Sequence, residues 1–456
     1  MYSKNAWNKY EGKSLDELMK FNEDYKEFLS NGKTERLCVR NALELAKAKG
    51  FKELEKAKSI KPGDKLYSIN RGKNIVLYVI GKENVKEGIN VLGAHIDSPR
   101  TDIKQNPLYE STDFALLDTH YYGGVKKYQW VTIPLALHGV VCKKDGTTVE
   151  IHIGEKEEDP IFCITDLLIH LSGEQLTKTA NKVIEGENLD VTIGSIPLKG
   201  EEKEPVKKNI LKILKETYGI EEEDFLSAEI EVVPSGKARD LGLDRSMVAG
   251  YGQDDRVCAY TSLRAILDLN EIPNKTACCI LVDKEEIGSV GATGACSNYF
   301  INTIAELLAL EGNGTDLKLR RTLTKSNMLS SDVSAGVDPL YLGVNELKNS
   351  CYLGKGIVFN KYTGSRGKSG CNDAAPEFIA KLRKMLDDND VNYQTAELGK
   401  VDQGGGGTIA YILANQNMNV IDAGVGVLNM HAPLEITSKV DVYEAYKAYK
   451  VFLLNA

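Results

Sequence analysis

The chain has 456 residues, which is long for one hydrophobic core, so we expect two domains and allow for one being inserted in the other. Its formal charge of −8 argues against a nucleic-acid-binding protein, because no basic stripe stands out to meet phosphates. The nine cysteines are odd in number and irregularly spaced, which favours a reducing, cytoplasmic compartment over a disulfide scaffold.

Membrane segments are not expected. The N-terminal residues contain no apolar stretch long enough for a signal peptide. No segment approaches the roughly 20 apolar residues that a membrane-spanning helix needs. The sequence therefore predicts a cytoplasmic protein that does not associate with membranes.

Helices and then strands are predicted in the first hundred residues. Ser14 followed by Glu17 has the spacing of a capping box and predicts a helix over residues 15–30. A second helix is predicted over residues 34–50. Strands are predicted at residues 65–70, 74–81 and 89–96. The last is a continuous apolar run reaching His95, as expected for a strand buried on both faces of a sheet.

The composition changes over residues 104–244. Short β-rich runs are interrupted by an acidic stretch at 154–160 and a charged segment at 198–225, whose charges we expect to face solvent. This change predicts a β-rich domain inserted at 104–244, between two parts of another domain at 1–103 and 245–456.

Strands and helices alternate again after residue 245. One face of a predicted helix is formed by Val257, Tyr260, Leu263 and Leu267. Further strands are predicted at 276–283 and 419–428, and further helices at 298–310 and 441–454. The fold class predicted from this alternation is α/β, with a central sheet and an insertion that interrupts it.

Two adjacent carboxylates, Glu285 and Glu286, directly follow the apolar run 276–282. Like charges side by side at the end of a buried strand repel each other in a low dielectric. A solvated strand end would make this arrangement tolerable, and so would a metal ion. The other polar residues of the sequence distinguish a solvated strand end from a metal site.

Other polar residues also stand at predicted strand or helix ends. His95 and Asp97 point to the same side of an extended segment, because strand side chains repeat every two residues. Asp254 begins a helix, Asp332 lies in a polar turn, and His431 follows a strand. Taken singly, the last three read as a helix cap, a turn residue and a loop histidine.

Taken together, these residues predict a metal site. Two histidines and several carboxylates at the strand ends of one α/β sheet lie where such folds place active sites. Mixed nitrogen and oxygen ligands suit zinc, with manganese and cobalt as alternatives, and so many carboxylates favour two ions. One glutamate of the pair would bind metal, and its neighbour would stay uncoordinated as the general base.

Five short motifs carry a family resemblance: GAHIDSPR, GQDDR, DKEEIGS, SSDVSAG and HAPLE. In this order they resemble the motif set of the aspartyl aminopeptidase family of co-catalytic di-zinc peptidases, whose central sheet is mixed with helices on both faces. The resemblance spans nearly the whole chain. Two departures stand out: Asp254 is followed by Asp255 where the family often has asparagine, and NKYTGSRGKSG differs from animal members.

The resemblance implies roles for the site residues. One zinc ion would be held by His95, Asp254 and Asp332. The other would be held by Asp254, Glu286 and His431, so that Asp254 bridges the two. Glu285 would be the general base that deprotonates a bridging water, and Asp97 would orient His95.

The resemblance also implies an assembly and a substrate class. The insertion would mediate dimerisation, and dimers would build a homododecamer. His170, in TDLLIHL, would reach the active site of a neighbouring subunit, whereas by composition alone it would be a core histidine. The substrates would be peptides with an N-terminal Asp or Glu. A cation must then meet the acidic side chain, and Lys355 and Lys361 are the first and second candidates, ahead of Arg366 and Lys368.

Three alternatives stay open at this point. The first is an aminopeptidase that prefers neutral residues. The second is a di-metal deacylase or carboxypeptidase, which acetylated peptides would distinguish. The third is a non-catalytic assembly protein that kept the fold, although no ligand and no base is missing from the motif set.

Overall fold

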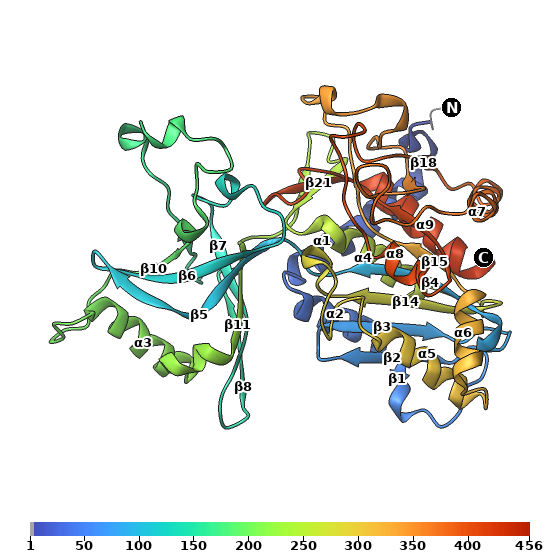
Figure 1. Ribbon diagram of the computed structural model, residues 1–456, viewed down its shortest axis with the longest axis horizontal. Coiled ribbons are helices and arrows are strands. Elements are labelled where there is room, and N and C mark those ends of the chain that lie inside the picture. The colour runs from blue at the N-terminus through green and yellow to red at the C-terminus, as the bar shows by residue number, and fades with distance from the viewer. Residues whose placement is uncertain (1–3) are drawn as a thin grey trace. The chain divides into compact units, whose positions relative to one another are not determined.

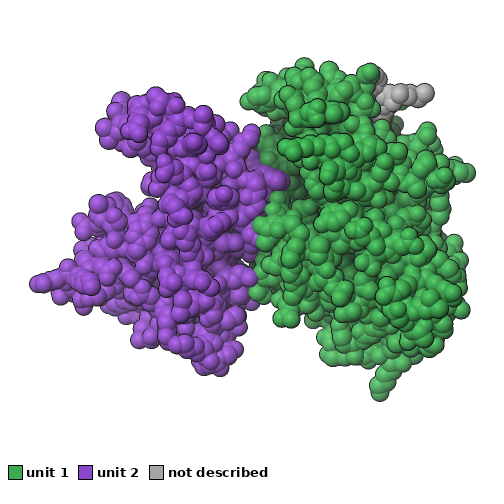
Figure 2. Space-filling view, viewed as in Figure 1, with its two compact units in different colours: residues 1–97, 238–430, 434–456 green, residues 98–237, 431–433 purple. Residues whose placement is uncertain are grey.

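The computed structural model describes residues 4–456 and divides them into two compact units (Figures 1 and 2). Unit 1 comprises residues 4–97, 238–430 and 434–456, and unit 2 comprises residues 98–237 and 431–433. Both limits of the inserted unit lie a few residues earlier than the sequence predicts. The reason is local pairing: β5 (Arg100–Ser111) belongs to the sheet of unit 2, and β12 (Arg239–Leu241) pairs with β13 (Met247–Gly250) in unit 1.

A mixed nine-stranded sheet forms the centre of unit 1, in the order β1-β2-β3-β14-β4-β15-β19-β17-β18. Its strands are β1 (Lys52–Glu53), β2 (Lys65–Asn70), β3 (Asn74–Val79), β4 (Ile89–His95), β14 (Thr276–Val282), β15 (Asn327–Ser330), β17 (Ile357–Asn360), β18 (Tyr393–Thr395) and β19 (Asn419–Gly424). Strands β14, β4, β15 and β19 run parallel to one another. The two central strands, β4 and β14, are buried at every residue, which explains their continuous apolar sequence.

Helices cover both faces of this sheet (Figure 1). On one face the apolar core takes side chains from α1 (Gly12–Asn31), α2 (Glu35–Ala48), α4 (Gln253–Leu267), α7 (Pro376–Asp388) and α9 (Lys439–Asn455). On the other face it takes them from α5 (Tyr299–Leu310), α6 (Asp316–Thr324) and α8 (Ala410–Ala414). The predicted α/β fold with helices on both faces is confirmed. None of the described helices is long and apolar enough to cross a membrane.

The prediction of one strand over 419–428 is wrong. The segment forms β19 of the central sheet and then β20 (Gly426–Leu428) of a five-stranded sheet, ordered β12-β13-β21-β20-β16. The other strands of that sheet not yet given are β16 (Ser334–Ala335) and β21 (Glu435–Ser438). The chain changes sheets next to Gly424, where a Cβ atom would lie 1.7 Å from the carbonyl oxygen of Asp332.

Unit 2 is built on an antiparallel sheet in the order β8-β7-β11-β5-β6-β10-β9. Besides β5, its strands are β6 (Phe114–Tyr122), β7 (Leu135–Cys142), β8 (Thr148–Ile153), β9 (Cys163–Ile164), β10 (Val191–Gly194) and β11 (Ala228–Pro234). Helix α3 (Pro205–Tyr218) packs its apolar side against this sheet through Val206, Ile210 and Leu214. The charged segment of the sequence therefore contains an amphipathic helix whose polar side faces outward.

Candidate metal centre

The parallel strands β4 and β14 end side by side, with His95 of β4 opposite Val282 of β14. After β14 the chain turns at Lys284, whose φ is +71°, into a short 3-10 helix, Glu285–Ile287. This turn returns both glutamates toward the end of β4. The ligand atoms of His95, Glu285 and Glu286 consequently lie within 4.8 Å of one another.

Asp97 fixes both the histidine and the turn that carries the two glutamates. Its Oδ1 lies 3.2 Å from His95 Nδ1 and accepts the backbone N–H of Glu285 at 3.1 Å. Its Oδ2 accepts the N–H of Glu286 at 3.2 Å, and the residue is fully buried. With Nδ1 occupied in this way, the His95 ring directs Nε2 into the carboxylate cluster. Asp97 therefore contacts the glutamate turn as well as His95, and its predicted role in orienting the histidine stays a prediction.

Asp254 and Asp255 have different surroundings at the start of α4, although both are buried. Asp254 Oδ1 lies 3.2 Å from His95 Nε2, so its carboxylate faces the cluster. Asp255 Oδ2 instead accepts the backbone N–H of His95 at 3.2 Å. Burial raises the pKa of Asp255 well above its usual value. Of the two neighbouring carboxylates, the geometry favours Asp254 as the metal ligand.

Asp332 completes the group in unit 1. It follows β15, and its carboxylate lies within 4.8 Å of ligand atoms of His95 and Asp254. Burial raises the pKa of Asp332, and the negative charges of Asp255 and Glu285 raise it further. Burial lowers the pKa of His95, but hydrogen bonds with Asp254 and Asp97 outweigh burial and raise it. Carboxylates gathered in this way repel one another unless a cation lies among them, and one imidazole with several carboxylates suits zinc, manganese or cobalt.

His431 is described with unit 2, in the segment 431–433 between β20 and β21. Its Nδ1 lies 2.8 Å from the carbonyl oxygen of Gly124. A carbonyl accepts only, so Nδ1 carries the proton and Nε2 has the lone pair that a metal requires. The imidazole therefore has the tautomer of a metal ligand, and its predicted role stays a prediction.

The two lysines predicted for the substrate pocket flank opposite ends of β17. The four residues of β17 lie between them, which is about 13 Å of extended chain. Lys361 pairs with Asp373 at 3.3 Å, whereas Lys355 lines a surface pocket with Arg383 and Asp390. Their predicted role in the substrate pocket stays a prediction.

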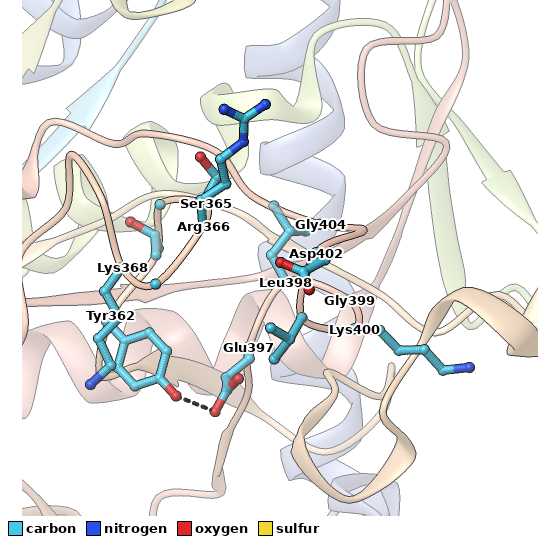
Figure 3. Close-up of a pocket in the computed structure, with 14 residues that line it drawn as sticks. Tyr362, Ser365, Arg366, Lys368, Glu397, Leu398, Gly399, Lys400, Asp402 and Gly404 are labelled. Carbon is cyan, nitrogen blue, oxygen red and sulfur yellow. Dashed lines mark hydrogen bonds between the residues drawn. The ribbon is translucent and has the colours of Figure 1, made fainter.

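A second pocket, of about 220 Å³, lies between the loops 362–368 and 397–404 (Figure 3). On one side Tyr362 donates its hydroxyl to Glu397 Oε1 at 2.5 Å, and Lys368 Nζ lies 3.9 Å from the centre of the Tyr362 ring. Figure 3 shows the side chains of Arg366 and Lys400 extending away from this pair. None of the predicted metal ligands is among the described residues that line this pocket.

His170 lies in a 3-10 helix, Ile169–Leu171, of unit 2. Composition alone predicts a core histidine there, and that expectation is wrong for this chain. His170 is exposed, and its neighbours Ile169 and Leu171 are 67% and 69% exposed. The apolar sequence around His170 therefore does not belong to the hydrophobic core of this chain.

Sequence reasoning missed a buried ionic group that supports the glutamate turn. Lys73 Nζ lies 2.8 Å from Glu35 Oε1 and 4.0 Å from Asp283 Oδ2, and Asp283 also accepts the Thr293 hydroxyl at 2.6 Å. Asp283 directly precedes the turn that begins at Lys284. Its partners come from distant parts of the sequence, so no local spacing could have indicated the group.

Comparisons with known proteins agree over almost the whole chain. A family model described as "Aminopeptidase I zinc metalloprotease (M18)" matches residues 28–453. The probable M18 family aminopeptidase 1 of Clostridium acetobutylicum is 61% identical over 457 residues, covering 99% of this chain and 98% of the relative.

Two solved structures are similar over their full length. The M18-family aminopeptidase of Thermotoga maritima is 48% identical with a TM-score of 0.96, covering 100% of both chains. Aminopeptidase I of Clostridium acetobutylicum is 58% identical with a TM-score of 0.94, covering 99% of both chains. These matches all include the stretch of sequence from His95 to His431.

Proposed function

Because the chain belongs to the M18 family of zinc metalloproteases and is a metallo-aminopeptidase, we propose that it removes acidic residues from the N-termini of peptides with two metal ions. The observation that carries this proposal is the cluster at the ends of β4 and β14. There the imidazole of His95 forms one group with Asp254 and Asp332 and another with the glutamate pair, and the ligand atoms within each group lie within 4.8 Å of one another.

Each ion has its own set of ligands in this proposal. One is held by His95, Asp254 and Asp332, and the other by Asp254, Glu286 and His431, with Asp254 shared. Zinc is the expected metal, and manganese or cobalt would fit the same donors. When bound, the ions would polarise the scissile carbonyl and lower the pKa of the attacking water.

Glu285 is the proposed general base. Its carboxylate lies 3.8 Å from His95 Nε2, and its side chain is 17% exposed, so water can reach it. Glu285 accepts a proton from the attacking water and returns it to the leaving amine. Asp97 contacts the backbone N–H of Glu285 and the ring of His95, and thereby fixes the position of the proposed base relative to the proposed ligand.

A substrate pocket that prefers N-terminal Asp or Glu needs a cation, since a buried carboxylate without a partner is strongly disfavoured. We assign this role to Lys355 first and to Lys361 second. An aminopeptidase with a preference for neutral residues is the alternative.

We also propose that the chain works as a homo-oligomer, assembled from dimers into a dodecamer by the inserted unit, with His170 serving a neighbouring active site. The exposed apolar residues beside His170 support this, because a large exposed apolar patch marks an interface. A dodecamer of mApe1 from S. cerevisiae has a TM-score of 0.76 and 20% identity with this chain. A cytoplasmic location remains part of the proposal, and none of the nine cysteines, all within the described residues, forms a disulfide.

The mechanism is tested by Glu285→Gln, which removes the base and keeps the size of the side chain. We expect the variant to retain both metal ions and to lose activity by about 10²–10⁴-fold. Metal analysis and peptide hydrolysis measure the two effects. The matched variant Asp254→Ala should lose metal as well as activity. If Glu285→Gln cleaved peptides at the wild-type rate, the assignment of the base would be wrong.

Specificity is tested separately with reporter peptides. Substrates with N-terminal Glu, Asp and Leu should be cleaved with the acidic ones preferred, and N-acetylated versions should not be cleaved. A preference for Leu would refute the acidic pocket and leave the proposed mechanism standing. Cleavage of the acetylated peptides would instead favour a deacylase or carboxypeptidase.

A further inference from the structure

Two histidines of unit 2 face each other across the β7–β8 ladder. His138 on β7 and His152 on β8 are direct cross-strand partners. Strand β8 is at one edge of the sheet, next to β7 (Figure 1). Their Nδ1 atoms lie 3.2 Å apart. None of the residues proposed for peptide hydrolysis belongs to this pair, so the juxtaposition needs its own explanation.

The outer nitrogen of each ring faces a carboxylate. His138 Nε2 lies 3.0 Å from Glu155 Oε1, and His152 Nε2 lies 3.3 Å from Glu150 Oε2. The other oxygen of Glu155 accepts the N–H of Gly236 at 3.0 Å, which fixes that carboxylate in turn. Because ionised carboxylates only accept, each Nε2 carries a proton. The two Nδ1 lone pairs then face each other, and only one proton can lie between them.

This arrangement matches the requirements of a metal bound by two imidazoles. Zinc–nitrogen bonds of about 2.0–2.1 Å at a tetrahedral angle place two ligand nitrogens about 3.3–3.4 Å apart, close to the separation seen here. Histidines that bind metal through one nitrogen commonly donate the other N–H to a carboxylate, as both rings do here. The side chain of His152 is 37% exposed, so water can complete the coordination.

We propose that His138 and His152 bind one divalent transition-metal ion through their Nδ1 atoms, linking β7 to β8. Imidazole ligands select zinc, nickel or copper, whereas magnesium and calcium require oxygen ligands.

The charges around the pair favour a cation. Glu150 and Glu155 are joined by Glu231 of β11, which is the direct cross-strand partner of His138 on its other side. The Glu231 carboxylate lies 3.2 Å from Nε of Arg100 and is thereby paired with a guanidinium. A divalent ion bound between the two imidazoles adds positive charge to this negative surrounding.

The competing explanation is a histidine pair that shares a proton and binds no metal. Nickel binding distinguishes this explanation from a metal site. Ni²⁺ is added to enzyme that already carries its zinc, and the mixture is then passed through a desalting column to remove unbound nickel. Wild-type protein should retain one nickel ion per subunit with its zinc content unchanged, whereas His152→Asn should retain none. His120→Asn is the matched control, because His120 is exposed in the same unit and its Nδ1 bonds the carbonyl oxygen of Tyr121.

A further measurement by calorimetry tests the details of the site. Glu150→Gln keeps both imidazoles but weakens the orientation of His152, so its affinity for nickel should fall about 10–100-fold. Equal nickel retention by wild type and His152→Asn would overturn the proposal. Unchanged peptidase activity of His152→Asn shows that the variant is folded.

Discussion

At the level of single residues, Asp97 accepts hydrogen bonds from three groups of the candidate metal centre: the ring of His95 and the backbone N–H groups of Glu285 and Glu286. The first bond presents Nε2 of the histidine to the cluster, and the other two fix the direction in which the glutamates leave β14. A charged acceptor with two oxygens is needed because all three partners donate. Asparagine at this position would turn an amide NH₂ toward one of these donors.

We therefore expect Asp97→Asn to damage the metal centre without touching a proposed ligand. Metal affinity and kcat should each fall about 10–100-fold, because one of the three donors loses its carboxylate acceptor. The backbone carbonyl oxygen of Asp97, 3.0 Å from His95 Nδ1, remains in place. The measurements are the rate of zinc loss to a chelator and the steady-state kinetics. Asp102→Asn, which changes an aspartate of the inserted unit paired with Arg100, is the control. Wild-type zinc retention in Asp97→Asn would contradict the role assigned to the carboxylate.

At the level of elements, the passage from β19 to β20 constrains the backbone that carries Asp332. The chain leaves the central sheet beside Gly424, and the carbonyl oxygen of Asp332 occupies the space that a Cβ would take. A side chain at this point can be accommodated only if the segment after β15 moves. The close packing of Gly424, at the end of β19, against the backbone of Asp332 thus fixes the position of this proposed ligand.

Gly424→Ala should consequently lower stability and weaken metal binding together. Overpacking of this kind costs about 1–3 kcal/mol in the free energy of unfolding, and displacement of Asp332 should speed zinc loss. Thermal unfolding with and without added zinc measures both effects. At Gly407 an added Cβ would have no atom within 4 Å, so Gly407→Ala serves as control and should resemble the wild type. Wild-type stability and zinc retention in Gly424→Ala would show that the segment moves freely.

At the scale of the whole molecule, one buried acid should make stability depend on pH. Burial raises the pKa of Asp422, in β19, to about 6. The folded state therefore holds this proton more tightly than the unfolded chain, whose aspartates titrate near 3.9. Stability falls as the pH rises between these two values, and the loss is complete above about pH 6.

Replacing Asp422 with asparagine should remove this dependence. The unfolding free energy of Asp422→Asn, relative to the wild type, should increase by about 2–3 kcal/mol between pH 4 and pH 7. Denaturant titrations at several pH values measure the difference. Asp388→Asn, at an exposed position of α7, is the control. A constant difference for Asp422→Asn would mean that the native state already holds the carboxylate ionised.

The sequence predicts those features that depend on local patterns. The buried strand ending at His95, the α/β alternation, the helix over 441–454 and the M18 resemblance are confirmed. The sheet change inside 419–428 was not predicted, because both strands are apolar and only the backbone contact at Gly424 separates them. The support of Asp283 by Lys73 was also missed, since its partners are distant in sequence.

His170 lies in an exposed apolar segment whose exposure is unusual for a monomer. Four large apolar side chains around it are at least 46% exposed: Leu167, Leu168, Ile169 and Leu171. Apolar side chains of this size are usually buried inside a protein or in an interface. Burial against a second copy of the chain would account for the pattern. The histidine in the middle of the patch would then enter that neighbour rather than its own core.

Mixing two inactive variants tests this assembly. Subunits carrying Glu285→Gln keep His170, and subunits carrying His170→Phe keep the base. If each active site combines its own Glu285 with His170 from a neighbour, random mixed oligomers should recover about a quarter of the active sites. Peptide hydrolysis measures the recovery after dissociation and reassembly, and each variant reassembled alone is the control. A mixture that forms verified mixed oligomers and stays inactive would mean that His170 does not act across subunits.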